Sequence, residues 1–370
     1  MSSSTSSSEP GSSEEALKSD AKLARKVARG SAPLFLGAML GGVVLALAAF
    51  SLAPESWIHT GPEYGMAEAF EDHIEQACAK KIAPELLILG DSRAVAGVSV
   101  KEIRAAGIDA EKFALGGSGI FAGWAALDRL VDCGVRPKTV VMAYGTVHML
   151  DKGAVMDRTA NYDVLKGKTR AHAYAMAGAW EDSKARQITY KAVSVLGTEL
   201  TGLDFVLMRP ALRNILEKPP HALENHRMNE EEHAGFLASG GDRFYGQADG
   251  TSELPDEATF EGGLREMPAK ATHAIAELGK ANGFDVKFYV LPVSQTAKTG
   301  LSPRIFEMAE EFHAGLARLD VTAINDVWVL PDADFGDPSH VNRQGREKVT
   351  ADFIARIGGN ALIKQAGAAN

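Results

Sequence analysis

The stretch "PELLILGDSRAVAGVSV" (residues 84–100) joins a hydrophobic run to a turn of small and polar residues. Four consecutive apolar residues, 86–89, are ended by Gly90. A short apolar run bounded by glycine is typical of a strand buried on both faces, as in a parallel sheet. The polar residues behind it then lie at the carboxyl end of the strand, where such sheets bind ligands.

Strand and helix patterns alternate along much of the remaining chain. Strands are expected at 85–90, 111–117, 138–145, 284–294 and 321–328, and helices at 66–80, 99–107, 121–134, 268–283, 302–320 and 343–359. The alternation predicts an α/β domain over residues 84–365, a three-layer sandwich whose parallel sheet has about five strands. We interpret residues 151–262 as an insertion at the strand ends, where loops commonly form substrate walls.

The N-terminal segment has the pattern of a membrane anchor. Residues 1–29 combine a serine-rich stretch, expected to be disordered, with a basic cluster. Residues 30–54 carry no charge and are long enough to cross a hydrocarbon core about 30 Å thick. We therefore expect a transmembrane helix at 30–54 and a linker helix within 55–83. The basic cluster before the transmembrane helix stays on the cytoplasmic side of the membrane.

This topology places the α/β domain outside the cytoplasm, in the periplasm if the anchor lies in a bacterial inner membrane. The alternative is a cleaved signal peptide, with residues 46–48 (Ala-Leu-Ala) as the cleavage site. A retained anchor is favoured because the apolar run exceeds the usual length of about 7–15 residues in signal peptides.

Composition excludes some classes of function. The net charge of −9 is unfavourable for binding nucleic acid. The two cysteines, Cys78 and Cys133, form no CxxC pair, so a zinc ribbon or a thioredoxin-type site is not expected. Each precedes an expected strand, which places both thiols at one end of the sheet. A disulfide and two unpaired thiols both remain open.

Two segments at expected strand ends carry a serine, an acid and a histidine. Ser92 follows the first strand, whereas Asp337 and His340 precede the last helix. Acyl transfer needs a nucleophile, a base that takes its proton and a group that orients the base, and these three residues fit those roles. The backbone N–H groups of Ser92 and Gly117 are candidates for binding the oxyanion, because glycine permits close approach.

The motifs "LILGDSR", "ALGGSG" and "DPSHVNRQG" together resemble the SGNH (GDSL-type) hydrolase superfamily. The resemblance covers roughly residues 84–150 and 265–358, and it implies a flavodoxin-like fold. It makes Ser92 the nucleophile, Asp337 the orienting acid and His340 the base. The oxyanion glycine of the second motif then falls on Gly116 or on the residue after it.

The third motif of the superfamily, which normally supplies an asparagine, has no match. The strand ends in "YGTVH", so Thr146 and His148 are candidates for the missing donor or for binding substrate. Asp91 and Arg93, the neighbours of Ser92, are further candidates for binding substrate. For Arg93 we favour a surface or structural ion pair, and for His148 a loop or core position.

Within the superfamily, an anchored chain with a late Asp-x-x-His resembles proteins that add or remove acetyl groups on extracellular polysaccharides, such as the periplasmic alginate acetyltransferases. The resemblance implies O-acetylation of a polysaccharide through an acyl-Ser92 intermediate, without a cofactor. Because a transferase outside the cytoplasm cannot use cytosolic acetyl-CoA directly, we also expect a membrane partner that passes acyl groups across. An esterase or deacetylase with the same residues is one alternative, and a glycan-binding module without catalysis is another.

Other patterns have simpler interpretations. "ALGGSGIFAGWAAL" resembles a dinucleotide fingerprint, but the next strand does not end in the acidic residue that would hold the ribose. "HALENHRMNEEEH" (221–233) lacks the spacing of a metal site, so we predict a polar loop and no bound metal. Trp124 is expected in the core. Phe244 and Tyr245 either stack on sugar rings or anchor a loop.

Overall fold

The computed structural model describes residues 64–145, 219–246 and 266–358, with the short pieces 37–38, 41–42, 169, 175–176, 250–251 and 253. The chain divides into two units, 1–58 and 59–370, and the fold below is that of the second. The predicted tail and nearly all of the predicted transmembrane helix lie outside the described residues. Among those that are described, no helix is both long and apolar enough to cross a membrane.

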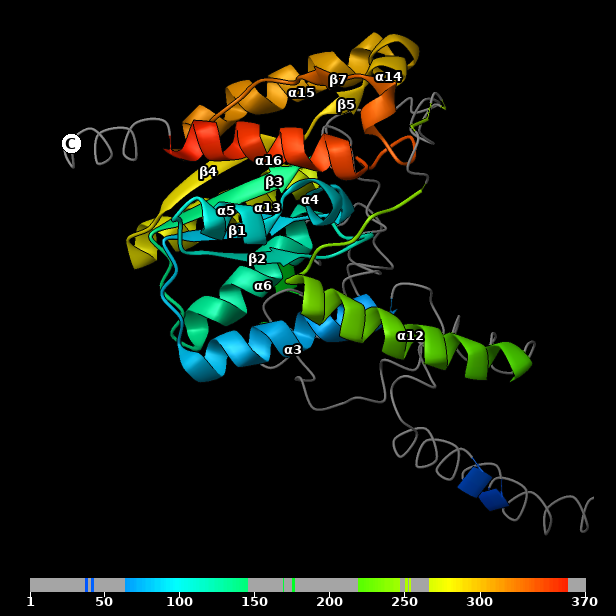
Figure 1. Ribbon diagram of the computed structural model, residues 1–370. Coiled ribbons are helices and arrows are strands. Elements are labelled where there is room, and N and C mark those ends of the chain that lie inside the picture. The colour runs from blue at the N-terminus through cyan, green and yellow to red at the C-terminus, as the bar shows by residue number, and fades with distance from the viewer. Residues whose placement is uncertain are drawn as a thin grey trace, which may run out of the picture. The chain divides into compact units, whose positions relative to one another are not determined.

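The second unit is built on a parallel sheet of five strands in the order β2-β1-β3-β4-β6 (Figure 1). The strands are β1 (Leu86–Gly90), β2 (Ala110–Ala114), β3 (Thr139–Tyr144), β4 (Asp285–Val290) and β6 (Thr322–Ala323). Every residue of β1 is buried, which explains its unbroken apolar run. The predicted α/β class and five-stranded parallel sheet are confirmed.

Helices lie on both faces of this sheet (Figure 1). They are α3 (Tyr64–Lys80), α4 (Ser92–Gly97), α5 (Val100–Ala105), α6 (Ile120–Asp132), α12 (Pro219–Ser239), α13 (Glu266–Asn282), α14 (Gln295–Gly300), α15 (Pro303–Leu316) and α16 (Arg343–Gly358). Phe288 packs on Phe312 of α15 and Tyr289 on Phe353 of α16, with ring centroids 5.4 and 5.0 Å apart. Because successive strand residues point to opposite faces, α15 and α16 cover opposite faces.

The strand order creates a switch point at the end of β1. From β1 the chain moves to β2 on one side, and it then returns to β3 on the other side of β1. Gly90, the last residue of β1, lies level with Ala114 of β2 and Ala143 of β3. In parallel sheets the crevice at such a point is the usual place for a ligand.

Three sequence-based predictions of local structure are wrong. The segment 321–328 is not one strand, because only Thr322–Ala323 (β6) is a strand and residues 324–328 are not. The segment 284–294 is not one strand, because Pro292 interrupts it and β5 (Val293–Ser294) pairs with β7 (Val329–Leu330) in a separate small sheet. The segment 221–233 is not a loop but part of α12, which lies beside α3 (Figure 1). Among the described side chains of α12, residues 227–239, only Asn229 and Phe236 are buried, so no wide apolar stripe marks this part of the helix in the sequence.

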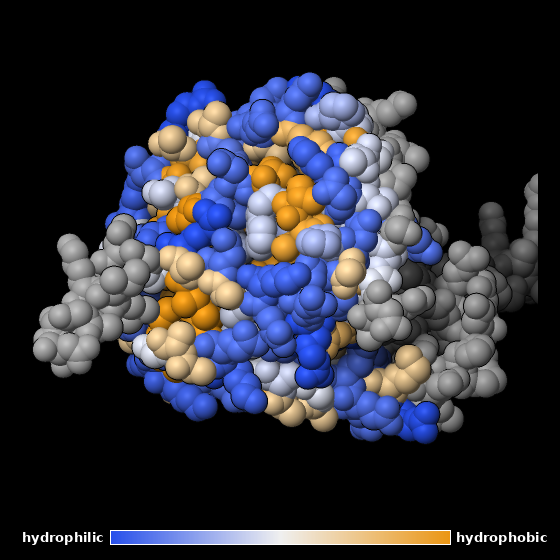
Figure 2. All heavy atoms as spheres, turned by 45° about the horizontal axis from the view of Figure 1, so that its top comes forward, coloured by the Kyte–Doolittle hydropathy of each residue, from blue (hydrophilic) through white to orange (hydrophobic). Residues whose placement is uncertain are grey.

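Hydrophobic residues on the face shown in Figure 2 lie in small groups among hydrophilic ones. Scattered exposed apolar side chains are normal on folded domains and need no partner to explain them.

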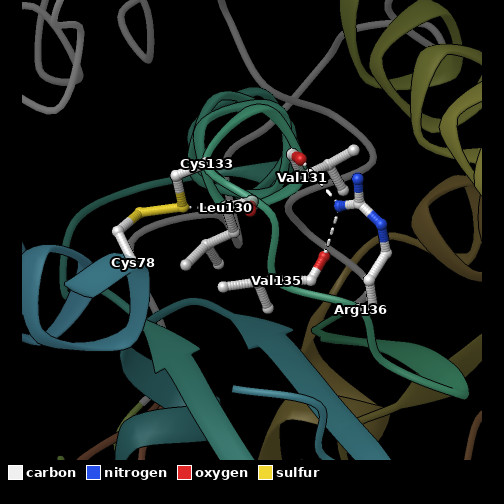
Figure 3. Close-up of a disulfide and its surroundings, with 6 residues drawn as sticks. All are labelled: Cys78, Leu130, Val131, Cys133, Val135 and Arg136. Carbon is white, nitrogen blue, oxygen red and sulfur yellow. Dashed lines mark hydrogen bonds between the residues drawn. A yellow bond between two sulfur atoms is a disulfide. The ribbon is translucent and has the colours of Figure 1, made fainter. Parts of the chain in front are cut away.

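Cys78 and Cys133 form a disulfide, with their Cα atoms 5.4 Å apart (Figure 3). The bond joins the last turn of α3 to the residue that ends α6. An ion pair between Arg129 of α6 and Glu71 of α3, 2.6 Å apart, links the same helices. The alternative of two unpaired thiols is therefore settled in favour of the disulfide.

Replacing both cysteines by alanine should lower the free energy of unfolding by about 2–4 kcal/mol, because the unfolded chain loses a cross-link between positions 55 residues apart. Urea unfolding of the oxidised protein and of the double variant measures the difference. Wild-type protein under a reducing agent is the matched control and should unfold like the variant. Equal stability of all three samples would contradict the expectation.

Candidate active site

Ser92 is the first residue of α4 and follows β1 after a single intervening residue. That residue, Asp91, caps the helix: its carboxylate accepts hydrogen bonds from the N–H groups of Arg93 and Ala94, at 2.8 and 3.2 Å. A Cβ at Gly90 would collide with Ala94 and with the backbone of β3. The cap and the glycine thus allow a tight strand-to-helix turn that presents Ser92 at the carboxyl edge of the sheet.

Asp337 and His340 lie in the loop between the 3-10 helix η5 (Asp332–Asp334) and α16. Nδ1 of His340 is 2.8 Å from Oδ2 and 2.9 Å from Oδ1 of Asp337. The backbone N–H groups of Ser339 and His340 also donate to this carboxylate, each at 2.8 Å. The loop therefore holds the acid and the imidazole in one fixed arrangement.

The charge of Asp337 follows from these contacts. Burial alone would raise the pKa of Asp337, but the hydrogen bonds and attraction from His340, together with the two backbone N–H groups, hold the pKa below its usual value. Asp337 is then a carboxylate at neutral pH. It selects the tautomer of His340 in which Nδ1 carries the proton and Nε2 is an acceptor.

The hydroxyl and the imidazole meet across 248 positions of sequence. Oγ of Ser92 lies 2.7 Å from Nε2 of His340, within hydrogen-bonding distance. The contacts form one continuous chain from the serine through the histidine to Asp337. In this geometry the imidazole can take the hydroxyl proton while the serine oxygen attacks a carbonyl carbon.

The glycines after β2 run past the turn that carries Ser92. The N–H of Leu115 donates to the carbonyl of Gly90 at 3.1 Å, which keeps the two chain segments adjacent. Gly117 has a φ of +64°, a conformation that favours glycine. Within the described part of the chain, the N–H groups of Ser92 and Gly116 donate to no protein acceptor. These two donors remain available to an oxyanion.

The other candidates for binding substrate have different positions. Asp91 is fully buried beneath the turn and caps α4, and its contact with substrate stays a prediction. Thr146 and His148 lie outside the described residues, as does most of the predicted insertion. The prediction that Thr146 or His148 supplies the hydrogen-bond donor in place of the missing asparagine therefore stays a prediction.

Arg93 links the two halves of the site. A Cβ at Gly145, just after β3, would collide with the Arg93 side chain, so the arginine lies directly over that glycine. Its Nε donates to the carbonyl oxygen of Ser339 and its Nη2 to Oγ of Ser339, each at 3.3 Å. These two hydrogen bonds give Arg93 a structural role at the loop of His340, and its predicted ion pair stays a prediction.

Replacing Arg93 by methionine should lower kcat/KM for an ester about tenfold, because the loop that carries His340 loses its tether to the turn of Ser92. Ester hydrolysis and thermal unfolding should be measured together. Arg304→Met, at an exposed position on α15, is the matched control and should leave the rate unchanged. A wild-type rate in the Arg93 variant would contradict this role.

Of the three histidines in residues 221–233, the structure describes the side chain of His233. His233 bonds through Nε2 to Oδ2 of Asp72, at 2.9 Å, and so joins α12 to α3. Within the described ranges, no group of three or more histidine, cysteine or acidic residues is placed to hold a metal ion. The described structure does not include the side chains of His221 and His226.

The aromatic candidates differ in burial, and Phe244 is 41% exposed. Trp124 is 1% exposed and confirmed as a core residue. Phe244 lies over the guanidinium of Arg346, and Tyr245 stacks on His340 with ring centroids 4.3 Å apart. The sequence offered loop anchoring as one of two roles for these residues, but it gave no sign that Tyr245 would contact the imidazole.

Comparison with family models, with curated proteins and with solved structures gives no match to this chain. The fold and the site define an α/β protein whose five-stranded parallel sheet carries a hydrogen-bonded serine, histidine and aspartate at its carboxyl edge.

Proposed function

We propose that this protein is a serine acyltransferase of the SGNH type, with a three-layer domain that O-acetylates an extracytoplasmic polysaccharide. The observation that carries the proposal is the continuous hydrogen-bonded chain from Ser92 through His340 to Asp337. A module that only bound glycans would not need a serine hydroxyl, an imidazole and a carboxylate in this order.

The proposed reaction has two halves. In the first, Nε2 of His340 takes the proton of Ser92 as Oγ attacks the carbonyl carbon of an acyl donor. Asp337 stabilises the imidazolium, and the N–H groups of Ser92 and Gly116 donate to the oxyanion. The tetrahedral intermediate then collapses. The leaving group departs with the proton from His340, and acyl-Ser92 remains.

In the second half, a sugar hydroxyl attacks the acyl carbon while His340 removes its proton. Collapse releases the O-acylated sugar and returns the proton to Ser92. If water attacks instead, the same residues perform ester hydrolysis. An esterase or deacetylase is the second candidate, because Ser92 is only partly buried and water can reach it. Neither route needs a cofactor.

The expected anchor in residues 30–54 sets the proposed location and partners. A domain in the periplasm, tethered to the inner membrane, has no direct access to cytosolic acyl-CoA. The proposal therefore includes a membrane protein that passes acyl groups across the bilayer, in a complex that makes or exports a polysaccharide. Full transfer by the purified chain, from a simple acyl ester to a polysaccharide, would contradict the need for such a partner.

The first experiment tests the nucleophile directly. The purified full chain is treated with a serine-reactive phosphonate, digested, and mapped by mass spectrometry. We expect one modified serine, Ser92, and no modification of the His340→Gln variant over the same time. Failure to modify Ser92 would overturn the proposal. Incubation of the wild-type chain with an acetyl ester and a polysaccharide then separates transfer from hydrolysis by the product formed.

A further inference from the structure

A short segment after α12 passes directly beside the proposed catalytic residues. We call residues 239–246 the strap. It begins where Oγ of Ser239 donates to the carbonyl of Phe236 and accepts from the N–H of Asp242. Gly240 and Gly241 both have positive φ, which turns the chain sharply away from the helix.

A buried ionic cluster holds the first half of the strap. Asp242 accepts a hydrogen bond from Nζ of Lys112, which lies in β2 and is 2% exposed. Its other carboxylate oxygen is 3.3 Å from Nη1 of Arg346 on α16. Burial lowers the pKa of Lys112, and the charge of Asp242 opposes that shift. Moving Asp242 away would leave the buried charges of Lys112 and Arg346 without their partner, which is energetically costly. The ion pairs therefore hold the strap in a fixed position.

The second half of the strap continues toward the site. The carbonyl of Arg243 accepts from Nη2 of Arg346 at 2.8 Å, and the Phe244 ring lies 3.6 Å from the same guanidinium. Gly246 has a φ of +68°, and a Cβ there would collide with the carbonyl of Gly336. The strap therefore packs closely on the loop that carries Asp337.

Tyr245 lies between these anchors and contacts His340. The two rings are 4.3 Å apart with an interplanar angle of 28°, so the phenol lies nearly flat on the imidazole. The phenol oxygen is 3.6 Å from Sδ of Met66, and it would be 3.1 Å from a Cβ at Gly116. The side chain thus spans from the proposed base to the proposed oxyanion glycine.

We propose that Tyr245 is a positioning residue, whose ring fixes the rotation of the His340 imidazole so that Nε2 points at Ser92. The hydrogen bond to Asp337 restrains Nδ1 but leaves the ring plane free to tilt. A flat aromatic contact of this kind restrains the tilt and covers one face of the imidazole. This inference rests on the proposed role of His340 as the base.

The test compares two variants of the full chain, Tyr245→Leu and Tyr245→Phe. The readout is the first-order rate at which a saturating phosphonate modifies Ser92, which depends on the base but not on binding of a sugar. We expect the phenylalanine variant within about twofold of wild type, because the ring is kept. The leucine variant should be about tenfold slower or more, with a similar thermal unfolding midpoint.

The outcomes separate this inference from the proposed function. A leucine variant as fast as wild type, or a phenylalanine variant as slow as the leucine one, would overturn the role of the ring while Ser92 remains the nucleophile. A wild-type chain that the phosphonate does not modify would overturn both.

A second measurement covers a leucine variant that fails to fold. In wild-type protein the carbon-bound ring protons of His340, assigned by comparison with His340→Gln, should show an upfield ring-current shift from the stacked phenol. The shift should persist in Tyr245→Phe. Its absence in the wild-type spectrum would overturn the stacking on which the inference depends.

Discussion

The Ser92→Ala variant of the full chain should lose at least about 10³-fold in kcat/KM for an acetyl ester, because the variant lacks the nucleophile that the imidazole activates. The loss should fall mainly on kcat, since the hydroxyl acts on the reacting carbon and contributes little to holding the substrate. Hydrolysis of a fluorogenic acetyl ester by wild type and variant measures both constants.

His340→Gln should cost about as much as Ser92→Ala, and the double variant should be no slower than either single variant. Residues that act as one unit lose their whole contribution when any member is removed. His273→Gln, on the exposed surface of α13, is the matched control and should keep the wild-type rate. Additive losses in the double variant would mean that the two side chains act independently, against the 2.7 Å contact between them.

The strands of the main sheet were the easiest part of the fold to predict. Strands buried on both faces must be apolar at every position, so "LLILG" and "TVVMAY" stand out from their surroundings. The helix α5 was marked by its ends, since Ser99 caps it through the N–H of Glu102 and Gly107 follows it with positive φ.

Other elements carried no comparable local signal. The helix α12 buries only Asn229 and Phe236 among its described side chains, residues 227–239, and its mostly polar sequence resembled that of a loop. The short helix α4 was missed for another reason. Its start depends on Asp91, whose carboxylate caps two N–H groups, and a Gly-Asp-Ser sequence is equally common in turns.

The candidate site divides in the same way. The sequence supplied the identities of Ser92, Asp337 and His340, because short motifs at strand ends mark residues that chemistry requires. It named Tyr245 as a residue that stacks on sugar or anchors a loop, but not as a contact of His340, because the position of Tyr245 depends on the contact between Asp242 and Lys112, 130 positions apart. A lysine in the middle of a buried strand was the available signal, since such a residue requires an acidic partner from elsewhere in the chain.

Replacing Asp242 by alanine should be the most destabilising single change outside the hydrophobic core. Both Lys112 and Arg346 are buried, and each would lose its only described acidic hydrogen-bond partner. Breaking a buried ion pair by removing one partner costs about 3–5 kcal/mol, because an uncompensated charge stays in the interior. Urea unfolding of the full chain measures the loss.

Glu85→Ala is the matched control for this change. Glu85 pairs with Lys138 at 2.8 Å, but the two side chains are 49% and 71% exposed, so its loss should cost less than about 1 kcal/mol. A double variant, Lys112→Met with Asp242→Asn, removes the Lys112–Asp242 pair but leaves the charge of Arg346, so it should recover part of the loss. Similar losses for Asp242→Ala and Glu85→Ala would show that the cluster is not a strong anchor.

The double variant also separates stability from positioning. If charge pairing serves only to stabilise the domain, a double variant that regains stability should also regain the wild-type rate at which the phosphonate modifies Ser92. Lys112 contacts Asp242 of the strap, and Arg346 contacts the carbonyl of Arg243. If these contacts position the strap, Ser92 in the stable double variant should still react with the phosphonate more slowly than in wild type. A wild-type rate in that variant would restrict the cluster to a stabilising role.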